Sequence, residues 1–232
     1  MRTPFLIGIS LVVALLSLWP ISKSTRFQFF GEAIARVETD MPVVALTLDD
    51  GPSRKHTAAV LEILEQKDAI ATFFLTGRES AANPDMVRQI IAAGHALGNH
   101  SYNHDRLVLK WPSAIGDDLA RTDAVLREAG YKASLPFRPP YGQKLFALPW
   151  ILRSDNRPSI MWDVAPEPDA QSAQELAEAV VTQARPGSII LLHVMYDSRA
   201  MSREALPLII DGLRERGFSL ITVDDLLALR VP

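Results

Sequence analysis

Apolar and polar positions change their period repeatedly along residues 43–229. Short aliphatic runs indicate buried strands, and the stretches between them carry apolar residues every three or four positions, as one face of a helix does. Repeated strand–helix units favour a parallel sheet. The pattern predicts strands over residues 43–48, 71–75, 96–98, 159–164, 188–193 and 219–223, and helices over residues 57–66, 85–93, 113–129, 147–154, 172–184, 203–216 and 224–229.

The first predicted strand ends in two adjacent acids, Asp49 and Asp50, which are followed by Gly51 and Pro52. Burying an unpaired carboxylate is costly, so a cation or hydrogen-bond donors should receive these side chains. Neighbouring strand residues point to opposite sides. One carboxylate can therefore face a metal while the other faces a water or an arginine, although the motif alone also fits an ordinary polar turn.

The chain has five histidines, and two of them, His100 and His104, are four residues apart. That spacing predicts two imidazoles on one face of a helical turn, at a strand-to-helix corner, although two surface histidines would fit the pair alone equally well. Two histidines and Asp50 form a plausible ligand set for Zn²⁺ or a similar ion. Ser101 stands where metalloprotease helices carry a glutamate, so the general base must lie elsewhere, and Asp49 is the candidate.

Two more motifs follow in the second half of the chain. Residues 137–142 read Phe-Arg-Pro-Pro-Tyr-Gly, and the two prolines stiffen a loop that can aim Arg138 and the Tyr141 backbone N–H at fixed points. The apolar run 188–192 ends in His193, at the C-terminal end of its strand. Each motif alone also fits a solvated arginine in a turn or a hydrogen-bonded core histidine.

Together and in this order, the motifs over residues 41–228 resemble the polysaccharide deacetylases of carbohydrate esterase family 4, which share the NodB homology domain. Residues 71–77 are similar to that family's second strand. The resemblance implies an α/β fold, a distorted and incomplete (β/α) barrel, with catalytic groups at the C-terminal ends of the strands. It implies a metal-dependent hydrolase that removes N-acetyl groups from an amino-sugar glycan such as peptidoglycan, an exopolysaccharide or chitin fragments.

The resemblance also implies a role for each matching residue. The metal ligands would be Asp50, His100 and His104, with zinc as the expected ion. Asp49 would be the general base that activates the attacking water, with Arg138 holding it, and His193 would be the general acid. The Tyr141 backbone N–H would stabilise the oxyanion, and Leu191 would line the pocket for the acetyl methyl group.

One segment departs from the family pattern. Relatives carry an aspartate that tunes the acid histidine, and Ala165 stands at that position here. Asp163 lies two residues earlier, on the same face if the segment is a strand. We therefore expect Asp163 to serve as the partner of His193 or Arg138.

Three other functions fit parts of the sequence. The same chemistry on a lipid-linked sugar, for instance deformylation, would suit a membrane-anchored chain, and O-deacetylation would suit the same metal site. A carbohydrate-binding protein with a degenerate site would suit Ala165, but the intact acids, histidines and Arg138 argue against it. Trp111, Trp150 and Trp162 are candidates for stacking on sugar rings or for packing at the core or rim.

The composition of the chain argues against some classes of partner and site. The formal net charge is −3, and no basic stripe occurs, which argues against nucleic acid as a partner. The chain has no cysteine, so disulfides and thiolate zinc sites are excluded.

The N-terminus predicts export. Residues 3–22 carry no charge and are strongly apolar, so residues 1–24 are expected to be a signal peptide or an N-terminal membrane anchor outside the fold. The expected location is the periplasm or another extracytoplasmic site, with attachment to the inner membrane if the segment is retained. Residues 25–40 would be a tether or the first barrel elements.

Overall fold

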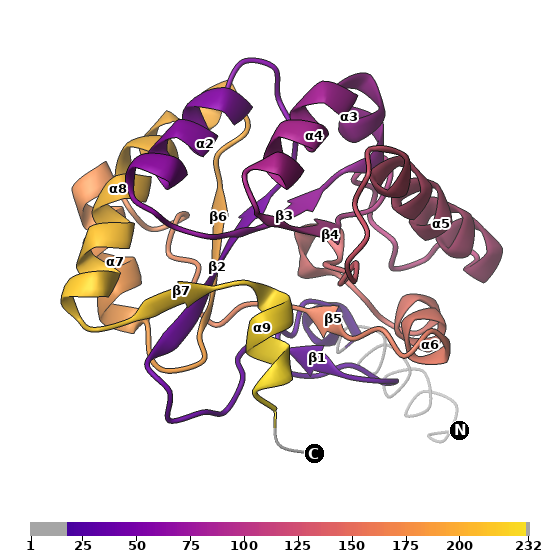
Figure 1. Ribbon diagram of the computed structural model, residues 1–232. Helices are drawn as coiled ribbons and strands as arrows, with labels where there is room; N and C mark the ends of the chain where they lie inside the picture. The colour runs from indigo at the N-terminus through magenta and orange to yellow at the C-terminus, as the bar shows by residue number, and fades with distance from the viewer. Residues whose placement is uncertain (1–17, 231–232) are drawn as a thin grey trace, which may run out of the picture.

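The computed structural model describes residues 18–230 as a mixed α/β domain, in which helices surround a parallel sheet (Figure 1). The strands are β1 (Ala33–Ile34), β2 (Val43–Asp49), β3 (Thr72–Leu75), β4 (Ala96–Asn99), β5 (Ser159–Ile160), β6 (Ile189–His193) and β7 (Ser219–Ile221). The α-helices are α2 (Thr57–Gln66), α3 (Gly77–Ala82), α4 (Pro84–Ala92), α5 (Pro112–Glu128), α6 (Ala147–Ser154), α7 (Ala173–Gln183), α8 (Ala200–Glu215) and α9 (Val223–Ala228).

The strands curve into a distorted, incomplete barrel. Five of them form a sheet in the order β4-β3-β2-β6, with β7 also paired to β2, and β1 pairs with β5. All of these pairs are parallel. Isolated bridges through Phe137 join β4 to β5, and a bridge at Val164 joins the chain after β5 to β6. The predicted parallel α/β fold is thus confirmed, and single bridges stand in place of regular strand pairing between β4 and β5 and between residue 164 and β6.

Strand β2 runs through the middle of the domain, and all seven of its residues are buried. Val44, Leu46 and Leu48 pack into the core that the sheet shares with α2, α4, α7 and α8. Because strand side chains alternate, Thr47 and Asp49 point to the opposite side, into the barrel. The hydrophobic pattern that buries the strand therefore also determines which carboxylate lies inside.

The predicted helices and strands occur, and apart from strand 159–164 their boundaries differ by at most three residues. The short helix α3 was not predicted. The predicted strand 159–164 ends as regular structure at Ile160, because the carbonyl oxygens of Ile160 and Met161 accept hydrogen bonds from the Arg138 side chain. The N–H groups of Ile160 and Met161 still donate to the backbone carbonyls of Phe137 and Ile34, so the arginine partners only the carbonyl side of this segment.

The first described residues contact the domain. The carbonyl oxygen of Ser22, which is fully buried, accepts a hydrogen bond from the Lys144 backbone N–H at 2.9 Å, and Lys144 Nζ donates to the Ser24 carbonyl. The expectation that residues 3–22 lie outside the fold is therefore wrong at Ser22. Residues 25–40 contain β1, which pairs with β5 and so forms part of the barrel.

The apolar run 5–16 that predicts a leader or anchor lies outside the described residues. From residue 18 to residue 230, no helix has the length and apolar character to cross a membrane.

Candidate functional site

The C-terminal ends of β2, β4 and β6 meet at one end of the barrel and form a cleft with a volume of about 340 Å³. That size suits a small-molecule or single-sugar site. In the sheet register, Asp49 is the partner of His193, so the end of β2 and the end of β6 lie side by side. The cleft is lined by Asp49, Asp50, His100, His104, Pro139, Tyr141, Gly142, Trp162, Ala165, Glu167, Pro168, Leu191, His193 and Arg199.

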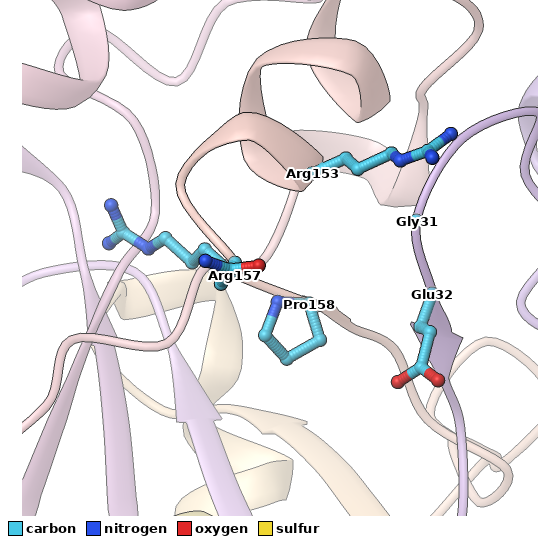
Figure 2. Close-up of a pocket in the computed structure, with 6 residues that line it drawn as sticks. Gly31, Glu32, Arg153, Arg157 and Pro158 are labelled. Carbon is cyan, nitrogen blue, oxygen red and sulfur yellow. The ribbon is translucent and has the colours of Figure 1, made fainter.

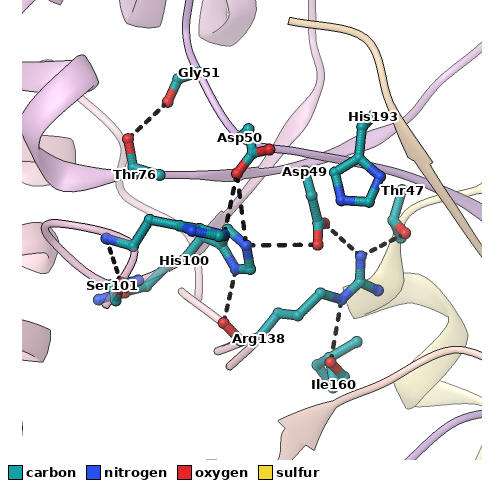
Figure 3. Close-up of polar contacts among 12 residues, drawn as sticks. Thr47, Asp49, Asp50, Gly51, Thr76, His100, Ser101, Arg138, Ile160 and His193 are labelled. Atoms are coloured by element: carbon teal, nitrogen blue, oxygen red, sulfur yellow. Dashed lines mark hydrogen bonds and ion pairs between the residues drawn. The ribbon is translucent and has the colours of Figure 1, made fainter. Parts of the chain in front are cut away.

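Arg138 is fully buried and holds Asp49 from inside the barrel (Figure 3). Its Nη1 donates to Asp49 Oδ1 at 2.6 Å and to Thr47 Oγ1 at 2.7 Å. Its Nε and Nη2 donate to the carbonyl oxygens of Ile160 and Met161, each at 3.1 Å. The guanidinium thus has an acceptor on each nitrogen, and Asp49 Oδ2 remains free to face the cleft.

Asp50 leaves the strand with a φ of 75°, in the left-handed region that aspartate tolerates better than most residues. Its Oδ1 is buried and has no hydrogen-bond partner among the residues that the structure describes. That oxygen lies 3.8 Å from His100 Nε2 (Figure 3). It also lies 3.4 Å from His104 Nε2. Ligand atoms of the three residues all lie within 4.8 Å of one another, a possible Asp–His–His metal site.

The two imidazoles are arranged to offer lone pairs. His100 Nδ1 donates to the carbonyl oxygen of Arg138 at 2.8 Å, and because a carbonyl can only accept, the proton sits on Nδ1 and Nε2 is free. Burial lowers the pKa of His100, although Asp49 and Asp50 oppose this effect. Burial also lowers the pKa of His104 and raises the pKa of Asp50. Neutral imidazoles are the form that binds a metal.

The prediction that His100 and His104 lie on a helical turn is wrong. Residues 100–111 form a loop in which Ser101 and His104 have φ values of 64° and 60°. The loop is held by side chains: Ser101 Oγ accepts the His104 N–H at 3.0 Å, and Asn99 Oδ1 accepts the Ser101 N–H at 2.8 Å. Asp118 on α5 accepts the Tyr102 N–H. Convergence of the histidines therefore comes from these hydrogen bonds rather than from helical spacing.

His193 lies across the cleft and is paired with Glu167. Its Nδ1 is 2.6 Å from Glu167 Oε2, and its backbone N–H donates to Oε1 at 2.9 Å. Ser202 Oγ also donates to Glu167 Oε1. Burial alone would lower the pKa of His193, but the hydrogen bond with Glu167 and the charges of Asp49 and Asp50 raise it. Burial raises the pKa of Glu167, and its hydrogen bonds with His193 and Ser202 outweigh this and lower it.

The expectation that Asp163 partners His193 or Arg138 is wrong. Asp163 accepts hydrogen bonds from Ser188 Oγ and the Ile189 N–H, each at 3.1 Å, and from Arg185. These contacts hold the start of β6 and lie at the end of the strand away from His193. Glu167 was missed, although it stands between two prolines only two residues after Ala165, and such a rigid setting for an acid was the available signal.

Tyr141 and Leu191 also lie where the sequence suggested a role. Tyr141 has a φ of 57° within the Pro140–Gly142 turn, its ring lies 4.7 Å from that of His104, and it lines the cleft. Leu191 is buried on β6 and lines the same cleft.

A second cavity lies between β1 and the end of α6, where Glu32, Arg153 and Pro158 surround it (Figure 2). Arg157 at its rim turns away and makes two hydrogen bonds to Asp123 on α5. This cavity contains none of the clustered acids and histidines, so the cleft is the candidate active site.

Comparison with known proteins agrees with this geometry. The sequence profile of the polysaccharide deacetylase family matches residues 36–154. The chain belongs to this family. A peptidoglycan-N-acetylglucosamine deacetylase of Bacillus cereus is 31% identical over 198 residues, which are 82% of this chain and 91% of that protein. A chitooligosaccharide deacetylase of Azorhizobium caulinodans is 32% identical over 199 residues, which are 80% of this chain and 95% of that protein.

Solved structures of family members superpose closely. A peptidoglycan N-acetylglucosamine deacetylase matches with a TM-score of 0.79 and 29% identity, over 83% of this chain and 91% of that one. A family 4 pseudoenzyme of Bacillus anthracis matches with a TM-score of 0.76 and 29% identity, over 85% of this chain and 70% of that one. Because a pseudoenzyme has the same fold, the fold alone does not indicate activity. Evidence for activity must come from the side chains in the cleft.

Proposed function

We propose that this polysaccharide deacetylase family member removes N-acetyl groups from an amino-sugar glycan by metal-dependent hydrolysis. The named relatives act as deacetylases of peptidoglycan and chitooligosaccharide, which supports this class of substrate. The observation that carries the proposal is the cleft itself. A buried Asp50 oxygen that has no hydrogen-bond partner within residues 18–230 faces two imidazole nitrogens, with Asp49 beside it and His193 across from it.

A divalent ion fits the residues that are present. One carboxylate and two neutral imidazoles are a common protein ligand set for catalytic zinc, and they leave positions for water and substrate. The orphaned Asp50 Oδ1 would gain the cation that its burial requires. We propose Asp50, His100 and His104 as the ligands and Zn²⁺ as the ion. When bound, such an ion lowers the pKa of water and polarises the carbonyl of the acetyl group.

The base side of the reaction would belong to Asp49. Arg138 occupies Oδ1, so Oδ2, which lies 3.7 Å from His100 Nε2, is the oxygen that can accept the proton of the attacking water. Because Arg138 is fully buried and has an acceptor on each nitrogen, it fixes this carboxylate in one orientation. The Tyr141 backbone N–H is the proposed donor to the developing oxyanion.

The acid side would belong to His193. Its Nδ1 is engaged by Glu167, so Nε2 is the atom that can donate a proton to the departing amine nitrogen. The raised pKa of His193 keeps that proton in place at a higher pH than an ordinary histidine would. Leu191, at the wall of the cleft, is the proposed contact for the acetyl methyl group.

Acetate release tests the proposal. The protein, loaded with Zn²⁺ or stripped by a chelator, is incubated with N-acetylglucosamine oligomers and with peptidoglycan. We expect release only from the metal-loaded protein, loss of release in Asp49→Asn, and normal release in Asp211→Asn, a change in a half-exposed acid that pairs with Lys67 on the outer helices. Metal analysis of the purified protein identifies the ion. Stoichiometric metal without acetate release from either substrate would refute the proposal.

We further propose that the domain acts outside the cytoplasmic membrane, because residues 3–22 carry no charge and are strongly apolar. A C-terminal reporter that is active only after export would be active when fused to the full chain. An inactive reporter would place the protein in the cytoplasm and contradict this location.

A further inference from the structure

Seven large apolar side chains are exposed near α5 and α6, which pack against each other beyond the edge of the sheet (Figure 1). Leu109 and Trp111 are 91% and 81% exposed. Three of the four tryptophans of the chain belong to this group, and the fourth, Trp162, lines the cleft. We call the group the aromatic face; it consists of Trp19, Phe27, Phe29, Leu109, Trp111, Phe146 and Trp150.

Contacts connect most members of the aromatic face. The ring of Phe29 lies 4.6 Å from that of Phe146 and 5.4 Å from that of Phe27. Trp19 and Leu109 line a common, mainly apolar cavity together with residues 18 and 145. Segments 18–30, 106–111 and 145–153, which are distant in sequence, therefore meet in one region with exposed apolar side chains, and such regions mark interaction sites.

The three segments of this face carry only basic charges, and one of the basic residues, Lys110, forms an ion pair with Asp105 directly before its segment. The three segments contain no aspartate or glutamate, although the whole chain has 27 acidic and 24 basic residues. They contain five basic residues, four of them exposed and Lys110 half-buried: Lys23, Arg26, Arg106, Lys110 and Arg153. Exposed aromatic rings favour apolar surroundings, and basic side chains attract anionic groups. This surface therefore suits a partner that is both anionic and partly apolar.

The chain also leads into this face from an apolar segment. Residues 3–22 carry no charge, and the first described residues, 18 and 19, already lie in the face. Tryptophan is enriched at membrane–water interfaces because its ring is apolar and its N–H is polar. Basic side chains beside a membrane are attracted to anionic headgroups. We propose that the aromatic face lies in the headgroup region of an anionic lipid bilayer, so that the folded domain itself contacts the membrane.

Arg106 links the aromatic face to the cleft. It lines the cavity shared with Trp19, and its guanidinium lies 4.4 Å above the ring of Tyr141, which lines the cleft. The cleft therefore opens beside the membrane-contacting surface. If the proposed deacetylase function holds, the substrate is the glycan nearest the bilayer.

The absence of cysteine allows a direct test of contact. Single cysteines are introduced in the full chain at Leu109→Cys and Trp111→Cys, with Leu208→Cys on α8 as the control exposed apolar position. Each is spin-labelled, and the protein is reconstituted in vesicles of phosphatidylglycerol and phosphatidylethanolamine. Collision with lipid-soluble oxygen is compared with collision with a water-soluble nickel complex.

We expect the oxygen-to-nickel collision ratio at positions 109 and 111 to be several times the ratio at position 208, and to fall when phosphatidylglycerol is replaced by a zwitterionic lipid. Nickel access equal to that at position 208 would overturn the proposal. Shielding from both reagents would also overturn it, because the face would then be covered by protein, either residues 1–17 or a second copy. The measurement does not use catalysis, so its failure is distinguishable from failure of the proposed function.

Discussion

Substituting Glu167 by glutamine removes the negative charge beside His193 and keeps the size of the side chain. The Nδ1–Oε2 contact of 2.6 Å is a charge-assisted hydrogen bond, and a glutamine oxygen would replace it with a neutral one. The difference between hydrogen bonds to charged and to neutral groups is about 1–2 kcal/mol. Because each 1.36 kcal/mol is tenfold in rate, we expect kcat/KM to fall roughly 5- to 30-fold.

The same substitution should also shift the pH profile of the reaction in one direction. Glu167 helps to raise the pKa of His193, so its loss lowers that pKa, and the proton needed by the leaving amine is lost at a lower pH. The alkaline limb of the kcat/KM profile for acetate release should therefore move to lower pH in Glu167→Gln.

Asp163→Asn is the matched control, because it also neutralises a buried acid bonded to β6 but has no contact with His193. Its alkaline limb should stay in place, and all three proteins should bind equal amounts of metal. A Glu167→Gln profile that superimposes on the wild-type profile would refute the role assigned to this pair.

Three further predictions follow from buried groups. Arg138→Lys should lower the free energy of unfolding in urea by about 2–4 kcal/mol, since an ammonium group cannot serve all four acceptors, and unchanged stability would contradict this. Asp123→Ala, which removes one of the two acceptors of Asn99 Nδ2 and so loosens the loop that carries His100, should weaken metal binding about tenfold in a chelator competition, while the exposed Asp117→Ala should not. Burial lowers the pKa of His95 to about 4, so the part of the free energy of unfolding that is present above pH 6.5 is lost as the pH falls toward 4. His95→Asn should reduce that loss by about 2 kcal/mol in urea titrations at the two pH values. Equal losses in the two proteins would argue against this role of His95.

Local sequence patterns were sufficient to predict most helices and strands of the fold. The apolar run of β2 and the helical periodicity of α2 lie where the sequence predicts them, because burial of a strand or of one helix face imposes a period that is visible in the residues. The ends of elements were less predictable. Strand β5 stops early because Arg138, 22 residues away in sequence, takes its carbonyl groups.

Residue chemistry in the motifs likewise indicated the acids, histidines and arginine of the cleft before any geometry was known. The prediction of how these side chains are positioned was wrong. The interval between His100 and His104 suggested a helix, but a network through Asn99 and Ser101 in a loop brings the two rings together. A spacing of four residues is compatible with either, and the two are distinguished by the hydrogen bonds of the folded loop, including the long-range bonds of His100 to Arg138 and of Tyr102 to Asp118.

The sequence by itself therefore determined the parallel α/β architecture, the family and the set of chemically capable side chains, because periodicity and short motifs are local properties of the chain. Tertiary structure alone decided which acid serves His193. Glu167 and Asp163 are four residues apart and carry the same charge, yet one turns to the end of β6 and the other to its start. The path of the backbone after β5 makes that choice, and it depends on packing across the whole barrel rather than on neighbours in sequence.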